Sequence, residues 1–145
     1  MHLFKRRLYQ EFEREDGEIK LVVDRIIGGE YSYRICLCEN GAHIGYCDLR
    51  TRHNESMYYF GNIGYRIFPN YRGNNYAYKA CLMLFDVAKE LDMRYLIITV
   101  SPENIASVKT CEKLNGEYIE TVNVPSWHPL YSMNERVKRV YRYIV

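Results

Sequence analysis

The chain has 145 residues, 48% of them apolar and 26% charged, which is enough for one domain with a buried core. Its formal net charge is only +2 and its basic residues form no concentrated stripe, so the composition argues against a nucleic-acid-binding protein. No apolar run approaches membrane-spanning length, and residues 2–9 carry Lys5, Arg6 and Arg7 in their middle, so we expect neither a membrane span nor a signal peptide.

Five cysteines, an odd number without a secretory signal, favour reduced thiols and a cytoplasmic location. We therefore treat residues 1–145 as a single cytoplasmic domain. Within residues 1–17, Phe4, Leu8 and Phe12 share one helical face and suggest a short amphipathic helix. The alternating pattern of residues 19–27 then predicts a first strand.

The next feature is an Asn-Gly pair at 40–41 between two strand-like segments, 33–38 and 42–49. Asn-Gly is the preferred two-residue type I′ hairpin turn, which predicts that Cys38 pairs with His43. In this register the expected core face consists of Ile35, Leu37, Ile44 and Tyr46.

The same register puts three thiols and an imidazole on the opposite face. They belong to Cys36, Cys38, His43 and Cys47. Such groups are zinc ligands, but zinc hairpins place ligand pairs two residues apart around a tight knuckle, and Cys47 lies well down the second strand. We therefore favour small packed side chains, with His43 in solvent, and expect no metal.

A strand, a helix and a second strand follow in the middle of the chain. A polar connection at 51–56 leads into a strand-like run at 57–68, which stops at Pro69 because proline cannot donate to a ladder. The spacing after the polar turn predicts a helix over 77–91, and the unbroken apolar run at 95–100 predicts a strand covered on both faces. The helix stripe consists of Ala80, Cys81, Leu84, Phe85, Ala88 and Leu91. This order is typical of a right-handed βαβ unit with parallel strands.

The last part of the chain predicts another helix and two more strands. Ser101 is the expected N-cap of a helix that ends near Leu114, with Asn115 and Gly116 as a left-handed cap. Residues 118–124 and 137–145 are expected strands on either side of a loop at 125–129.

The turn at 72–77 opens the central helix, so its free N–H groups form a potential phosphate site. Its sequence, Arg-Gly-Asn-Asn-Tyr-Ala, resembles the Arg/Gln-x-x-Gly-x-Gly/Ala pyrophosphate loop of the Gcn5-related N-acetyltransferases (GNAT). It follows the strand end Gly-Tyr-x-Ile-x-Pro-x-Tyr at 64–71, which is common in that family. A second motif, Asn-Ile-Ala-Ser at 104–107 with Cys-Glu-Lys-Leu-Asn-Gly at 111–116, resembles the branch related to the ribosomal-protein N-acetyltransferases.

The resemblance implies an α/β (α+β) fold: a mixed, mostly antiparallel sheet with a central βαβ unit whose parallel strands splay to hold acetyl-CoA. Backbone groups of the first splayed strand then bond the pantetheine arm, as an added strand would. The N–H of Tyr65 is the expected donor to the thioester carbonyl. The implied acetyl-CoA-binding residues are Tyr65, Arg66, Ile67, Arg72, Gly73, Asn74, Asn75, Tyr76, Ala77, Asn104 and Ser107.

Three positions depart from the family pattern. Asn75 stands where the loop usually has glycine, but asparagine tolerates the left-handed conformation, so we expect binding to persist. Cys111 stands where many relatives have a tyrosine that protonates the leaving thiolate. Thr99 stands near the position where some relatives have a carboxylate base.

A base, a desolvating pocket or a less basic amine is nevertheless needed. An amine of pKa about 10.4 lies roughly 4–5 kcal/mol from its neutral form at pH 7. His53 and Glu55 are the first candidates for a base, and His128 and Tyr131 are alternatives. Cys111 as a nucleophile is a weaker hypothesis than Cys111 as a core residue.

We expect an acetyl-CoA-dependent N-acetyltransferase in which an amine, of a small molecule or a protein N-terminus, attacks the thioester directly. The alternatives are a non-catalytic acetyl-CoA-binding regulatory module of the same fold and an interaction domain that binds no cofactor. We expect no nucleic acid, membrane or metal partner, and either a monomer or a homodimer.

Overall fold

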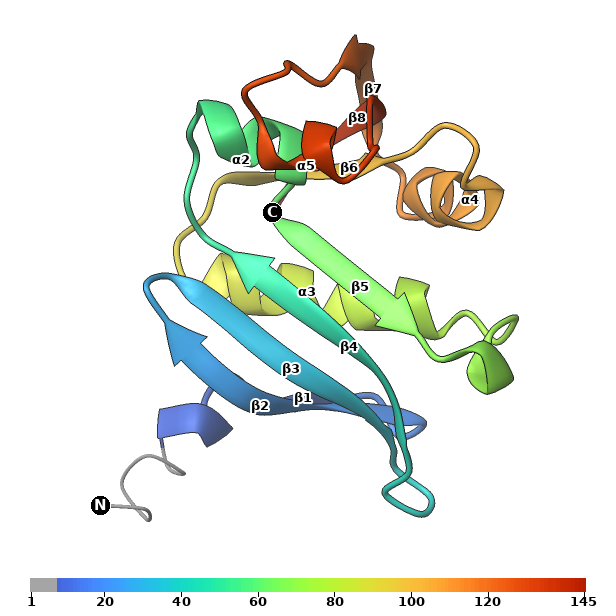
Figure 1. Cartoon of the computed structure of the whole chain (residues 1–145). Coiled ribbons are helices and arrows are strands. Elements are labelled where there is room, and N and C mark those ends of the chain that lie inside the picture. The colour runs from blue at the N-terminus through green and yellow to red at the C-terminus, as the bar shows by residue number, and fades with distance from the viewer. Residues whose placement is uncertain (1–7) are drawn as a thin grey trace.

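The structure, a computed structural model, describes residues 8–145 as two antiparallel sheets with helices packed on them (Figure 1). The five-stranded sheet contains, in chain order, β1 (Arg14–Glu15), β2 (Ile19–Ile27), β3 (Glu30–Leu37), β4 (His43–Arg50) and β5 (Ile63–Ile67). The three-stranded sheet has the order β6 (Tyr95–Val100), β8 (Val137–Ile144), β7 (Glu117–Asn123). The remaining elements are α2 (Glu55–Phe60), a 3-10 turn η1 (Pro69–Tyr71), α3 (Tyr76–Glu90), α4 (Ile105–Lys113) and α5 (Pro129–Ser132).

Helix α3 packs across the inner face of the five-stranded sheet and lies behind it in Figure 1. Its limits differ by one residue at each end from the predicted 77–91. The buried positions are Ala80, Cys81, Met83, Leu84, Val87 and Ala88. They face the alternating side chains of β2, whose Ile19, Leu21 and Val23 are buried as predicted. The α/β fold with mostly antiparallel strands is therefore confirmed.

The two sheets meet at one buried side chain, Asn62, which is 1% exposed. Its backbone N–H donates to Ile97 O at 2.6 Å, and its Oδ1 accepts from Ile97 N at 2.8 Å. Its Nδ2 donates to the carbonyl oxygens of Arg50 and Arg52, both at 2.9 Å. Beyond this point β5 and β6 belong to different sheets, so the expected splay of the βαβ unit is confirmed.

The predicted strand over 57–68 is wrong in its first part, because residues 55–60 form helix α2. The side chain of Asn54 accepts a hydrogen bond from Met57 N at 2.8 Å and caps the helix. The aromatic residues Tyr58, Tyr59 and Phe60 suit a strand locally, but the cap and tertiary packing favour the helix.

The hairpin between β3 and β4 also differs from the prediction. Asn40 Oδ1 accepts from Ala42 N at 2.9 Å, and Gly41 N donates to Leu37 O, so the connection between the strands has five residues, 38–42, rather than two. The register shifts here, and Cys36, instead of Cys38, lies opposite His43. The hydrogen bond from Ala42 N to the Asn40 side chain thus stabilises a longer turn than the predicted type I′ turn.

This shift places Cys47 on the core side, where it is 2% exposed. Tyr46, which was expected on the core face, is instead 48% exposed. The proposed thiol and imidazole face therefore does not form. Among residues 8–145, no group of three or more His, Cys, Asp or Glu side chains is placed to hold a metal ion.

Helix α4 begins later than predicted. Its N-cap is Asn104, whose Oδ1 accepts from Ser107 N at 3.2 Å, so the expected N-cap at Ser101 is wrong. Asn115 has φ 62°, which confirms the left-handed end of this helix. Strands β7 and β8 lie where they were predicted, and the loop before β8 contains the short helix α5.

The expected N-terminal helix falls partly on residues 1–7, outside the described residues. Residues 8–10 are helical. Phe12 then packs edge-on against Tyr31 at 5.2 Å between ring centroids, and Tyr33 Oη donates to Phe12 O at 2.8 Å. Over the described range, no helix is both long enough and apolar enough to cross a membrane.

Replacing Asn62 by Ala should lower the free energy of unfolding by about 2–4 kcal/mol, because it leaves the buried Ile97 N–H and two partly buried carbonyls without this partner. Urea unfolding measures this loss. Asn123→Ala, at the exposed end of β7, is the matched control and should change stability by under about 0.5 kcal/mol. Equal stability of the two variants would contradict the role given to Asn62.

Two buried thiols predict how stability depends on pH. Burial raises the pKa of Cys47 and of Cys81 above the ordinary value of 9.0. Cys81 and Asp48 raise the pKa of Cys47 further, and Cys111 does the same for Cys81. Because the folded pKa exceeds the unfolded one, the stabilisation is complete below about pH 9 and is lost as pH rises. The free energy of unfolding should therefore fall above pH 9.

Cys81→Ala should make this fall shallower by about 1.4 kcal/mol per pH unit between about pH 9.5 and 11, since one titrating group is removed. Urea unfolding at a series of pH values measures the slope. Val87→Ala, which opens a cavity on the same helix without removing a titrating group, should lower stability but keep the wild-type slope. A wild-type slope in Cys81→Ala would refute this explanation.

Candidate functional site

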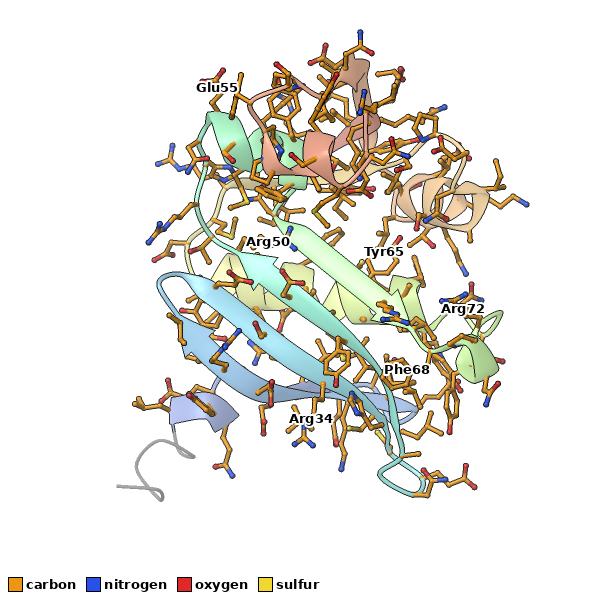
Figure 2. All side chains as sticks on the ribbon, viewed as in Figure 1. Arg34, Arg50, Glu55, Tyr65, Phe68 and Arg72 are labelled. Carbon is orange, nitrogen blue, oxygen red and sulfur yellow. The ribbon has the colours of Figure 1, made fainter. Side chains whose placement is uncertain are left out.

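A cleft of about 550 Å³ lies between β5, the start of α3 and α4. Every residue predicted to bind acetyl-CoA lines it except Asn74. Figure 2 shows Tyr65 on the side of β5 that faces α4 and Arg72 near the turn at the end of that strand. Residues from two distant motifs, 64–77 and 104–107, are thus brought to one site.

The edge of β5 that faces the cleft offers unpaired backbone groups. Arg50 N donates to Asn62 O, and Phe68 N donates to Ile44 O, at the two ends of the β4–β5 pair. Because hydrogen-bonded positions alternate along antiparallel strands, the register directs the backbone groups of Tyr65 and Ile67 away from β4. Arg72 Nε already donates to Ile67 O at 3.0 Å, so the guanidinium braces the end of the strand.

The turn before α3 presents free amides to the cleft. Asn75, the N-cap, has φ 62° and makes no side-chain capping hydrogen bond. Gly73 has φ 83°, a conformation suited to glycine, and an added Cβ would meet nothing within 4 Å. Asn74 points elsewhere, with Nδ2 donating to Tyr71 O at 3.0 Å, which explains its absence from the lining. The first N–H groups of a 15-residue helix are therefore open to an anion.

Two lysines add positive charge on the opposite wall. Lys109 and Lys113 of α4 line the cleft, and Lys113 Nζ lies 4.4 Å from the centre of the Tyr78 ring. They were not singled out from the sequence, although their i, i+4 spacing on a predicted helix places them on one face. With Arg66 and Arg72, they make the cleft suitable for a polyphosphate.

A second pocket of about 270 Å³ shares Tyr65, Asn104 and Ser107 with the cleft and continues it toward α5. The charged residues in its lining are Arg50, Glu135 and Lys138. Lys138 Nζ lies 3.3 Å from Glu135 Oε1. Neither member of this pair was singled out from the sequence, since both follow a loop with no motif.

Tyr65 stands at the junction of the two pockets. Its hydroxyl is buried close to Ser107 and Thr110, and burial raises the pKa of this phenol. The phenol therefore stays protonated at neutral pH. A phenol of raised pKa is a poor proton donor to a thiolate, whose pKa is about 8.5, so Tyr65 suits hydrogen bonding better than acid catalysis.

The predicted base candidates lie away from this junction. His53 stacks on Tyr95 at 4.2 Å between ring centroids and contacts Tyr95 O through Nε2, in a different pocket. Glu55 is exposed in the first turn of α2, and Figure 2 shows it far from Tyr65. Tyr131 is covered by the Arg136 guanidinium, 3.8 Å from the ring centre.

His128 is a structural residue with both ring nitrogens engaged. It is 1% exposed, its Nδ1 accepts from Leu130 N at 3.1 Å, and its Nε2 lies 2.9 Å from Ser56 O. The proton therefore sits on Nε2, and the ring ties α5 to α2.

Cys111 and Thr99 are also engaged structurally. Burial raises the pKa of the Cys111 thiol to about 11. Only about one thiol in 10⁴ is then ionised at pH 7, which argues against a covalent acetyl-cysteine intermediate. Thr99 Oγ1 donates to Tyr59 O at 2.8 Å and fixes α2 on β6.

Comparisons with known proteins agree with this geometry. Residues 4–117 match the Acetyltransferase (GNAT) domain family. No curated protein matches the chain. An acetyltransferase from Agrobacterium tumefaciens is similar, with 27% identity, a TM-score of 0.61, and coverage of 81% of this chain and 62% of that one.

Two further solved structures have the same fold at lower identity. Ribosomal-protein-S5-alanine acetyltransferase from Vibrio fischeri has a TM-score of 0.64 at 14% identity, with 80% of this chain and 62% of that one covered. Mycobacterium smegmatis RimJ, solved with CoA-disulfide, has a TM-score of 0.63 at 17% identity, with 81% and 54% covered.

The chain spans under two thirds of the length of these solved relatives. The family match nevertheless covers most of the chain and includes the turn at 72–77 and the cap at Asn104. The chain belongs to the GNAT acetyltransferase family.

Proposed function

We propose that the chain is an acetyl-CoA-dependent N-acetyltransferase in which an amine attacks the thioester directly. The proposal treats residues 1–145 as one cytoplasmic domain and gives its five free cysteines no catalytic role. The observation that carries it is the continuous path from the open amides at the start of α3, along the free edge of β5, to the pocket beside Glu135. Such a path holds a long nucleotide thioester at one end and an acceptor at the other.

In this proposal, the amides of residues 73–77 and the side chains of Lys109 and Lys113 hold the pyrophosphate. The free edge of β5 bonds the pantetheine arm as an added strand. Asn104 uses Oδ1 in its helix cap, which leaves Nδ2 to donate to the arm. The backbone N–H of Tyr65 polarises the acyl carbonyl where negative charge develops.

Acetyl-CoA supplies a thioester that is already activated, so the chain must mainly orient the acceptor and remove its proton. The leaving thiolate needs less help than an alkoxide would, because thiols are much more acidic than alcohols. The absence of a tyrosine at Cys111 is therefore compatible with turnover.

We assign the base to Glu135 in place of His53 and Glu55. It lines the pocket that shares Tyr65 with the cleft, while Lys138 holds its Oε1 and leaves Oε2 for the acceptor. The acceptor ammonium loses a proton to this carboxylate directly or through one water.

A thiol-release assay with acetyl-CoA and a panel of amines tests the proposal. Release that depends on an amine, with a matching acetylated product, supports it. A rise in melting temperature with CoA but no turnover on any amine would instead favour a non-catalytic acetyl-CoA-binding module. If saturating CoA does not raise the melting temperature, both the enzyme and the acetyl-CoA-binding module are excluded.

The turn before α3 provides a binding prediction. Asn75→Val should weaken acetyl-CoA binding about 5- to 30-fold, because a β-branched residue costs about 1–2 kcal/mol at the φ of 62° found here. Asn75→Gly should bind equally or more tightly, since glycine adopts this conformation freely. Calorimetric titration measures both. A large loss in Asn75→Gly would show that the asparagine side chain itself contacts the ligand.

The assignment of Glu135 provides a kinetic prediction. Glu135→Gln should lower kcat/KM about 100-fold at pH 7, and the deficit should shrink as pH rises, because the amine then loses its proton without help. Glu55→Gln, a matched control outside the cleft, should keep wild-type rates. Parallel pH profiles for Glu135→Gln and the wild type would exclude Glu135 as the base.

A further inference from the structure

The acceptor pocket contains a fixed guanidinium, Arg50, that the acetyl transfer itself does not require. Its Nε lies 2.8 Å from Asp48 Oδ2, and its Nη1 donates to Gly61 O at 2.9 Å. The Phe60 ring centre lies 6.0 Å from its Cζ. The side chain is only 23% exposed, so Arg50 has little freedom to leave this position.

Strand β5 has a glycine where the guanidinium crosses it. A Cβ on Gly64 would lie 2.7 Å from Arg50 Nη2 and 2.8 Å from Asp48 Oδ1. Any larger residue would therefore displace the Arg50–Asp48 pair. Gly64 and Arg50 both line the second pocket, so the Nη2 end of the guanidinium lies along its wall.

Nη2 is the end of Arg50 available to a ligand. None of the hydrogen bonds formed among residues 8–145 uses it, whereas Nη1 is bound to the end of α2. Figure 2 shows Arg50 near the start of β5 and Tyr65 farther along the same strand, so the pocket has a cationic end and an acyl-transfer end.

The charges of the pocket favour an acceptor that carries an anionic group in addition to its amine. Lys138 is paired with Glu135, and Asp48 is paired with Arg50. When Glu135 receives the amine proton, it becomes neutral, so Lys138 loses its anionic partner and the pocket is left with one uncompensated positive charge. A carboxylate on the acceptor would balance this charge, and a planar fork such as Arg50 binds carboxylates well.

The size of the pocket limits the acceptor. A volume of about 270 Å³ lies below the range of about 300–1,000 Å³ usual for drug-sized ligands. It suits a molecule of amino-acid size.

We propose that the acceptor is a small amine that also carries a carboxylate, bound by Arg50 while its amine faces Tyr65 and Glu135. This inference rests on the proposed function. In the reaction, the N–C bond forms, the C–S bond breaks, the amine proton passes to Glu135 and the electron pair leaves on the thiolate. The nitrogen loses a second proton as the amide forms, and this proton passes to the departing thiolate, so the products are a neutral amide and the thiol of CoA. The carboxylate is unchanged, so it contributes to binding alone.

Matched acceptors test this on the wild-type protein. Each of a set of amino acids is compared with its carboxamide and with its decarboxylated amine in the thiol-release assay. We expect kcat/KM at least 10-fold higher for the acid than for either partner. Intrinsic chemistry favours the amide, whose amine is less basic, so a preference for the acid must come from the protein. Equal or higher rates for the amides, or for C-terminally amidated peptides, would overturn the proposal.

Arg50→Gln should raise KM for the preferred acid about 10- to 100-fold, with little change in kcat and little change for the amide. Arg34→Gln removes an exposed guanidinium from β3, on a part of the sheet that Figure 2 shows below the cleft, and should keep the wild-type preference. Melting temperatures check folding. If Arg50→Gln does not fold, Arg50→Lys serves, because it keeps the charge and loses the planar fork.

A binding experiment separates this inference from the proposed function. In the CoA-saturated wild type, calorimetric titration compares N-acetyl amino acids with their carboxamides. Tighter binding of the acids supports the role of Arg50 even if no amine is acetylated. Equal binding, or no binding of either, overturns it even if simple amines are acetylated.

Discussion

The structure depends on the bonding of one buried amide side chain. Asn62 joins the end of β4, the start of β5 and the middle of β6 through its backbone and its side chain together. A fully satisfied buried amide is strongly directional, because any displacement leaves donors and acceptors unpaired in a dry interior. It therefore fixes where the two sheets touch and, beyond that point, where they separate.

The separation opens the cleft on which the proposed function rests. A β-strand with one paired and one unpaired edge is able to bind an extended ligand arm, and helix α3 begins after the turn that follows this strand. The left-handed turn at Gly73 and Asn75 leaves the first helical amides open. These three parts lie together because they follow one another in the chain between Asn62 and Ala77, and α4 closes the cleft from the other side.

Much of this region was predictable from sequence, for a physical reason. The periodicity of α3, the breaks at Pro69 and Gly73 and the run of β6 all reflect interactions with near neighbours in the chain. Prediction was wrong where a polar side chain competed with the backbone pattern. Asn54 capped a helix within an aromatic run, and Asn40 bonded to Ala42 N and shifted a register. Both outcomes depend on geometry that residue type alone does not specify.

The sequence alone determined the family, the α/β class and the turn at 72–77 that opens the central helix, because these depend on short segments whose residues act together. It did not determine the pocket that we propose for the acceptor. Arg50, Glu135 and Lys138 come from the end of β4, the loop before β8 and β8 itself, and only packing of the two sheets brings them to one pocket. His53 and Glu55 are close to β5 in the sequence, but the helix that Asn54 caps separates them from the second pocket in the structure. Long-range packing decided that side of the site, because no local pattern records which distant side chains share a cavity.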